Sequence, residues 1–147
     1  MGRGAVAAIV LGLAFGLTAC GQTGNPEFAG RAADDFMRAL ATGDAQGAWE
    51  HLTSKTQEVA YDNDMAAFVN DVESSDWSEL GWEIGQVSDY DISWGVRVQI
   101  DGSPVPTFLM ETGIAGGQED ASTIILLVQF ASGNDYLIAG QGLDERL

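Results

Sequence analysis

Chemically reactive side chains are scarce in this sequence. Its 147 residues include one cysteine, Cys20, and one histidine, His51. A single cysteine cannot form an internal disulfide, and a catalytic triad or a Cys-His pair would have to use these two residues. Structural zinc sites take about four ligands, mainly Cys and His, so they are excluded as well. We therefore expect no catalytic set of these types, no bound metal and no cofactor.

Positive charge is also scarce. Six Lys and Arg face 22 Asp and Glu, which gives a formal net charge of −16. Nucleic-acid binding requires clustered cations that displace counterions, so we expect no nucleic-acid partner. The acidic excess is typical of a solvated surface that favours solubility. The length and the 46% hydrophobic content are those of one globular domain with a sizeable core.

The first twenty residues have the organisation of a bacterial export signal. Arg3 supplies a basic start, and an uncharged apolar stretch follows over Ala5–Leu17. At about 13 residues this stretch suits a signal peptide and is shorter than the roughly 20 residues that span a bilayer as a helix. The next residues look like the lipobox of bacterial lipoproteins: Leu17, Thr18, Ala19 and Cys20.

The lipobox resemblance implies a lipid anchor at Cys20. In that family the cysteine thiol receives a diacylglyceryl group, a peptidase cuts before the cysteine, and the new amino terminus can be acylated too. The expected organisation is a signal peptide over residues 1–19, a lipidated cysteine and flexible tether over 20–26, and a domain over 27–147. The domain would lie at the outer face of the cytoplasmic membrane, with the outer membrane as an alternative. A second interpretation is an ordinary secretory signal in which the cysteine is incidental.

The first half of the expected domain shows helical patterns. Asn25, Pro26 and Glu27 have the form of a helix start, and Gly43 ends the first run. Asp44 can cap a second helix. The segment Ser54–Gln57 has capping-box form and predicts a short helix through Ala60, and a third helix is expected to begin at 62–64. The apolar residues at helical spacing are Phe28, Ala32, Phe36, Met37, Leu40, Ala48, Trp49, Leu52, Met65, Phe68, Val69 and Val72.

The second half shows the period-two alternation of strands. Leu80, Trp82 and Ile84 alternate with polar or small residues, and the clearest strand is predicted from Tyr90 to Asp101. Further strands are expected at 108–112, at 123–130, which would be central because of its continuous apolar run, and at 136–139 after a turn at 132–135. The segment 113–121 is expected to be a loop. Helices followed by an antiparallel meander predict an α+β fold with about four strands.

Two segments resemble the NTF2-like superfamily. The sequence from Phe36 to Leu52 looks like the start of NTF2-like domains, including those of small exported lipoproteins, where a helix ends in Gly-Asp and the next carries an aromatic residue followed by leucine. The segment from Asn134 to Gly140 is similar to the final strand of that superfamily. The resemblance covers about residues 27–142 and implies a cone in which N-terminal helices and a curved sheet enclose a pocket.

The resemblance also implies which residues belong to a pocket. The expected lining residues are Trp49, Tyr61, Trp82, Trp94, Glu111 and Tyr136. In isomerase-like members a buried carboxylate moves a proton opposite acidic or phenolic donors. The residues available here are Glu83, Asp91 and Glu111 as carboxylates, with Tyr61, Tyr90 and Tyr136 as donors.

Structural interpretations compete with each of these functional ones. Trp82 and Trp94 fit the core of the sheet, and the phase of Glu83 and Asp91 indicates exposure to solvent. His51 is expected to be a surface or half-buried structural histidine. The run from Asp62 to Asp64 resembles the opening of a calcium loop, but an alanine stands where the sharp turn needs glycine, so helix capping is the better interpretation.

The leading functional hypothesis is a non-enzymatic, membrane-anchored envelope lipoprotein. Its domain would bind an envelope protein partner or a small apolar ligand, and it would contact the membrane through the anchor. The second hypothesis is an isomerase- or hydrolase-like enzyme that uses a pocket carboxylate. A third is a structural spacer in the envelope.

Overall fold

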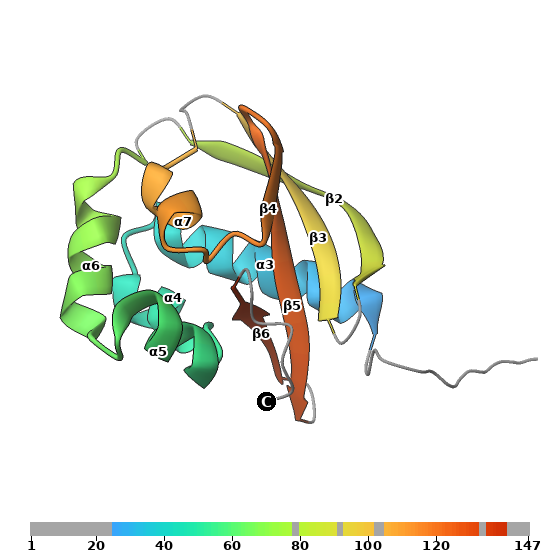
Figure 1. The fold of residues 1–147 in the computed structure, drawn as a ribbon. Coiled ribbons are helices and arrows are strands. Elements are labelled where there is room, and N and C mark those ends of the chain that lie inside the picture. Colours follow the sequence, from blue (N-terminus) through green and yellow to red (C-terminus); the bar gives the residue numbers. More distant parts are fainter. Residues whose placement is uncertain (1–24, 78–79, 91–92, 102–104, 133–134, 141–147) are drawn as a thin grey trace, which may run out of the picture.

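The computed structural model describes residues 25–77, 80–90, 93–101, 105–132 and 135–140. This part of the chain has an α+β fold with five helices and an open, antiparallel five-stranded sheet (Figure 1). The helices are α3 (Pro26–Ala41), α4 (Ala45–Glu50), α5 (Ser54–Tyr61), α6 (Met65–Ser74) and α7 (Thr107–Glu111). The strands are β2 (Gly81–Tyr90), β3 (Ser93–Asp101), β4 (Gly117–Asp120), β5 (Thr123–Ser132) and β6 (Asp135–Ala139). The α+β order predicted from the sequence is confirmed.

The long helix α3 begins and ends where the sequence predicts. The Asn25 side chain caps its first turn by accepting a hydrogen bond of 2.8 Å from the backbone N–H of Glu27, and Pro26 occupies the first turn, where no N–H is required. After Ala41 the chain passes through Gly43 at φ 81°, a left-handed conformation that glycine adopts without steric cost. One face of α3 is buried: Ala29, Gly30, Ala33, Phe36, Met37, Ala39 and Leu40.

The short helices each begin with a side-chain cap. Asp44 accepts from the Gly47 N–H at 3.0 Å to start α4, and Asp64 accepts from the Ala67 N–H at 3.2 Å to start α6, both as predicted. The cap of α5 is Thr53 instead of the predicted Ser54. The Thr53 hydroxyl accepts from the backbone N–H of Thr56 and is buried, so packing decides between two adjacent residues that can both cap.

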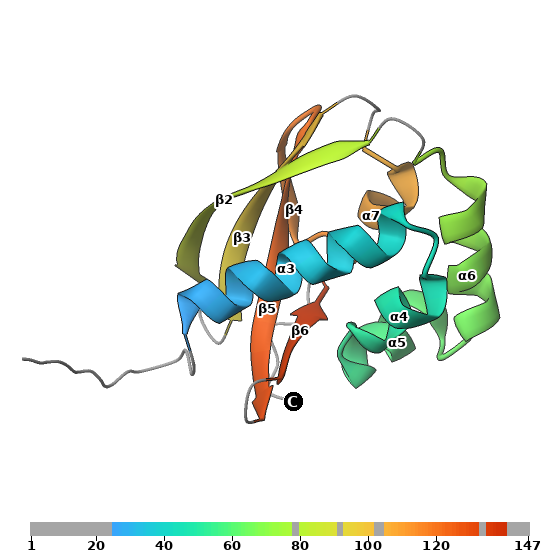
Figure 2. The ribbon, with the colours of Figure 1, turned by 180° about the vertical axis from the view of Figure 1, so that it is seen from behind.

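Strand β5 is the centre of the sheet, as its apolar run predicts. One of its edges pairs with β3, and the other pairs with β4 near Thr123 and with β6 near Phe130, while β2 pairs with the outer edge of β3. Helix α3 lies across one face of this sheet, and α4, α5 and α6 gather at one end (Figure 2). The core between α3 and the sheet includes Phe36, Met37, Leu40, Val96, Val98, Ile124, Leu126, Val128 and Ile138.

The segment around Phe108 corrects one prediction. Residues 108–112 were expected to form a strand, but Thr107–Glu111 form α7, with both Phe108 and Leu109 buried. Adjacent buried residues contradict the alternation that a half-exposed strand needs, and Leu, Met and Glu favour helices. The expected loop at 113–121 contains β4, which takes the place of the predicted strand at 108–112. The sheet has five strands, where the predicted fold had about four.

The predicted strand from Tyr90 to Asp101 also needs correction. Tyr90 belongs to β2 and pairs with Ser93 at the start of β3, so the chain reverses between them. The expected Asp91 and Ile92 positions lie outside the described residues. Alternation continues by chance through this reversal, which is why period alone did not reveal it.

Candidate functional site

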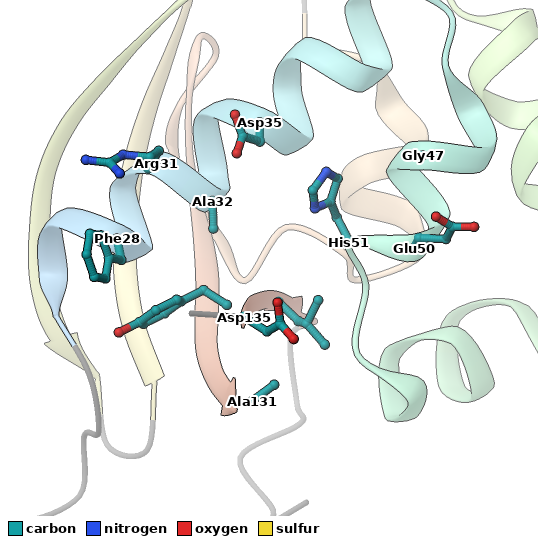
Figure 3. A pocket seen from close by; sticks show the side chains of 11 residues that line it. Phe28, Arg31, Ala32, Asp35, Gly47, Glu50, His51, Ala131 and Asp135 are labelled. Atoms are coloured by element: carbon teal, nitrogen blue, oxygen red, sulfur yellow. The ribbon is translucent and has the colours of Figure 1, made fainter. Parts of the chain in front are cut away.

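A cavity of about 720 Å³ lies between α3, α4 and the hairpin of β5 and β6 (Figure 3). Its volume is in the range of small-molecule pockets, roughly 300–1,000 Å³. The lining residues are Phe28, Arg31, Ala32 and Asp35 of α3, Gly47, Glu50 and His51 at α4, and Ala131, Asp135, Tyr136 and Leu137 of the hairpin.

Just after α4, the chain forms backbone hydrogen bonds with β6 at Ile138, at the edge of the cavity. The Ile138 N–H donates to the carbonyl of His51 at 2.7 Å, and the Thr53 N–H donates to the carbonyl of Ile138 at 2.9 Å. These two bonds make a parallel bridge between Leu52 and Ile138. Before Leu52 the chain is helical, because the His51 N–H bonds to Ala48. The helix therefore turns away from β6 and leaves space beside Tyr136.

Aromatic rings form one end of the cavity. The ring of Tyr136 contacts Phe28 at 5.9 Å and Phe130 at 5.4 Å between centroids, both edge-on. The Tyr136 hydroxyl accepts a hydrogen bond of 2.8 Å from the backbone N–H of Asn25. The guanidinium of Arg31 lies 5.2 Å from the Phe28 ring centre. The start of α3 is thereby joined to the C-terminal strand.

Two exposed carboxylates lie at the opening of the cavity. Figure 3 shows Asp35 of α3, His51 at the end of α4 and Asp135 of β6 approaching from three elements. Both aspartates are exposed, and His51 is half-buried. The Glu50 side chain is directed away from the opening. The local cation, Arg31, is already paired with Glu27 at 3.5 Å.

Tyr136 is the residue of the predicted pocket set that lines this cavity. Trp49 and Tyr61 lie instead in an aromatic cluster among the helices, where Trp49 and Tyr61 both contact Phe68, at 5.5 Å and 5.4 Å. The Tyr61 hydroxyl donates to Asp71 at 2.6 Å. Burial, and then the adjacent Asp71 carboxylate, raise the pKa of Tyr61 well above its usual range. Trp49 and Tyr61 are half-buried and pack against the core through Phe68.

The other predicted residues lie away from the cavity. Trp82 is half-buried, and its indole N–H donates to Asp34 at 2.8 Å, while Trp94 is half-buried against the core. Glu83 and Glu111 are exposed, and Tyr90 is 52% exposed. Asp91 lies outside the described residues. The structure therefore does not bring the candidate carboxylates and tyrosines together.

Sequence reasoning missed most of the cavity. Phe28 and Ala32 were assigned to the apolar stripe of α3, but they line the cavity, on the side of the helix that Figure 3 shows facing Tyr136 and β6. His51 was expected to be a structural histidine, and its place in the cavity lining was not predicted. No local signal connects the flank of α3 with a strand more than ninety residues later, because helical spacing does not specify which neighbour a flank meets.

The run from Asp62 to Asp64 is used for helix ends. Asp62 and Asn63 adopt positive φ values of 55° and 61° at the end of α5, and Asp64 caps α6. This confirms the capping interpretation. Within the described ranges, no three metal-ligating side chains gather into a group.

No protein-family model, curated protein sequence or solved structure matches this chain. The described residues include no helix of the length and apolarity that crossing a membrane requires.

Proposed function

We propose that this protein is a lipid-anchored envelope protein whose NTF2-like domain is a binding module for a partner protein or a small apolar ligand. The observation that carries the binding role is the cavity beside Tyr136, which has an aromatic end and an open, polar mouth. The anchor is proposed at Cys20, with residues 1–19 removed, on the outer face of the cytoplasmic membrane.

The order and joints of the elements support the NTF2-like assignment. Helices precede an antiparallel meander, and α3 covers one face of the sheet. Gly43 and Asp44 connect α3 to α4: Gly43 adopts a left-handed conformation, and Asp44 caps α4. The last strand, β6, pairs with the long β5. These features are those that the superfamily resemblance implies.

Chain length places the cavity close to the proposed anchor. Asn25 is hydrogen-bonded to Tyr136, so the first described residue lies at the cavity. Asn25 stands five positions after Cys20 in the sequence. A fully extended chain spans at most about 3.6 Å per residue, so the two residues are at most roughly 18 Å apart. A lipidated Cys20 would therefore hold the cavity near the membrane surface. An acidic domain has no electrostatic attraction to anionic lipids, so the acyl chains would supply the attachment.

The exposure of the candidate carboxylates favours binding over proton transfer. An acid–base carboxylate is tuned by burial in its site, as in isomerases of this kind. Glu83 and Glu111 are both exposed, on β2 and α7 respectively, and neither lines the cavity.

Replacement of Cys20 tests the anchor. We expect the wild-type chain from bacterial membranes to partition into detergent and to carry a lipid mass increment on its first residue. The Cys20→Ser chain should be uncleaved or water-soluble and should lack the increment, because the hydroxyl does not replace the thiol as lipid acceptor. Equal partitioning of both chains would overturn the anchor.

A photo-crosslinking amino acid tests the binding role. Placed at Leu137, which lines the cavity, it should capture a partner in intact membranes or a ligand identified by mass spectrometry. The matched control is Val59, which is 57% exposed on α5 and outside the cavity lining. The same crosslinked products at both positions, or no crosslinked product at either, would contradict a binding role for the cavity.

A further inference from the structure

The edge of β6 presents unpaired backbone groups to the cavity. In an antiparallel ladder, alternate residues direct both N–H and C=O toward the same neighbour. Ile138 directs its two groups away from β5, to His51 and Thr53. Tyr136, two residues earlier in the same strand, therefore also directs its N–H and C=O away from β5. Among the described residues outside β5, no backbone group forms a hydrogen bond with these two groups of Tyr136.

These groups lie next to a short backbone bridge on the same edge of β6. The bridge between Leu52 and Ile138 occupies the next outward-facing residue of β6, and the departure of α4 leaves the position beside Tyr136 open. Tyr136 is only 7% exposed and lines the cavity. Sheltered backbone groups require partners, and an open strand edge is a template for another extended chain.

The charge around this edge is complementary to a basic ligand. Asp35 and Asp135 lie at the mouth of the cavity, and neither forms an ion pair with a described residue. Each of the four Lys and Arg side chains in the described ranges is already paired with a carboxylate: Arg31, Arg38, Lys55 and Arg97. Among the described lining residues, Arg31 carries one positive charge against the three carboxylates of Asp35, Glu50 and Asp135, so this lining has an excess of negative charge.

We infer that the cavity binds an extended peptide segment with basic side chains, which adds to the edge of β6 through the backbone of Tyr136. This inference rests on the proposed binding function and names its partner class. Main-chain hydrogen bonds would supply affinity, as in other cases of strand addition, and the two aspartates would select for basic residues. The proximity of the cavity to the anchor favours a segment of another envelope protein that lies close to the membrane.

Two pairs of synthetic peptides test this inference. The protein is purified from membranes and placed in nanodiscs of zwitterionic phosphatidylcholine, which do not attract cationic peptides. We expect fluorescence anisotropy to detect binding of a peptide of alternating lysine and valine, and at least tenfold weaker binding of the matched glutamate–valine peptide. The second pair carries N-methyl groups on either the lysine or the valine amides. Because one set of amides faces β6, one methylated peptide should lose about tenfold in affinity and the other should not.

Charge variants locate the peptide. We expect Asp35→Asn combined with Asp135→Asn to weaken the lysine–valine peptide about tenfold. The matched control, Asp89→Asn combined with Asp101→Asn, removes the same charge from exposed positions outside the cavity lining and should bind as wild type. Equal weakening in both double variants would show a general charge effect and would overturn the inference.

The remaining outcomes separate this inference from the proposed function. Parental affinity of both methylated peptides, or equal binding of the glutamate and lysine peptides, overturns strand addition of a basic segment. If a fluorescent fatty acid occupies the cavity and no peptide competes, the basic-peptide inference is wrong while a binding module for apolar ligands stands. If neither peptide nor fatty acid binds and crosslinking at Leu137 yields nothing, the proposed binding function is wrong as well.

Discussion

The phenol hydroxyls of Tyr61 and Tyr136 have opposite hydrogen-bonding roles. Tyr136 accepts from the backbone N–H of Asn25 and so joins the start of α3 to β6. Tyr61 donates to the carboxylate of Asp71 within the helical layer. A donor role requires the protonated phenol, so the fold favours the neutral form of Tyr61. Burial is the largest cause of the raised pKa of Tyr61, and this hydrogen bond to Asp71 is the next.

The raised pKa of Tyr61 predicts a loss of stability at alkaline pH. Its contribution is complete below the unfolded-state pKa of about 10 and is lost as the pH rises from there toward the folded-state value. Tyr61→Phe should lower the free energy of unfolding by about 1 kcal/mol near neutral pH and should reduce the alkaline decline. Urea unfolding at several pH values measures both effects.

The control for this prediction is Tyr90→Phe. Tyr90 is 52% exposed on β2, and replacing it should change neither the neutral stability nor the alkaline slope by a comparable amount. Identical alkaline slopes for wild type and Tyr61→Phe would show that Tyr61 does not contribute.

At the scale of elements, the segment before β4 lies in close contact with β5. The Gly116 N–H donates to the carbonyl of Ile125 at 2.7 Å. A Cβ atom added at Gly116 would lie 2.5 Å from Cγ of Leu127, whereas one added at Gly117 would meet Ile125 at 3.8 Å. The loop can approach the strand this closely only because residue 116 has no side chain.

This contact predicts opposite results for two neighbouring substitutions. Gly116→Ala should destabilise the protein by about 1–3 kcal/mol, because Leu127 is buried and has little room to move. Gly117→Ala should be neutral or stabilise by up to about 1 kcal/mol, because alanine restricts the unfolded chain at no steric cost. The midpoints of chemical unfolding compare the two variants. Equal destabilisation would mean that strand propensity, and not the contact with Leu127, is responsible.

At the scale of the whole molecule, the excess of negative charge destabilises the folded state. The formal net charge is −16, and the ion pairs among the described residues all lie at the surface, where a pair contributes only about 0–1 kcal/mol. Repulsion among the excess carboxylates is therefore not offset by attraction inside the fold.

Salt should consequently stabilise this protein. Raising NaCl from about 10 mM to about 1 M shortens the Debye length from roughly 30 Å to roughly 3 Å and screens the repulsion. If screening contributes about 1 kcal/mol, the Tm should rise by roughly 4 °C, measured by circular dichroism at constant pH. A falling Tm would show that the ion pairs outweigh the repulsion. An uncharged osmolyte of matched osmolality separates screening from general solvent effects.

Several features of the fold follow from the sequence alone because their causes are local. Asn25, Asp44 and Asp64 cap helices, since an acceptor next to free N–H groups needs no distant partner. The apolar run of β5 predicted a central strand, and the turn at 132–135 predicted its hairpin with β6. The lipobox at Cys20 is likewise a local pattern, and it stays a prediction together with the anchor.

Only the tertiary structure decided which surfaces meet. It made a helix of 107–111 and reversed the chain after Tyr90. It also packed Trp49 and Tyr61 against the core, while Phe28 and His51 line the cavity. The cavity depends on how α4 and β6 are placed relative to each other, and that placement results from packing across the whole domain. Periodicity specifies which face of an element is apolar, but it carries no information about the neighbour that the element's flank will contact.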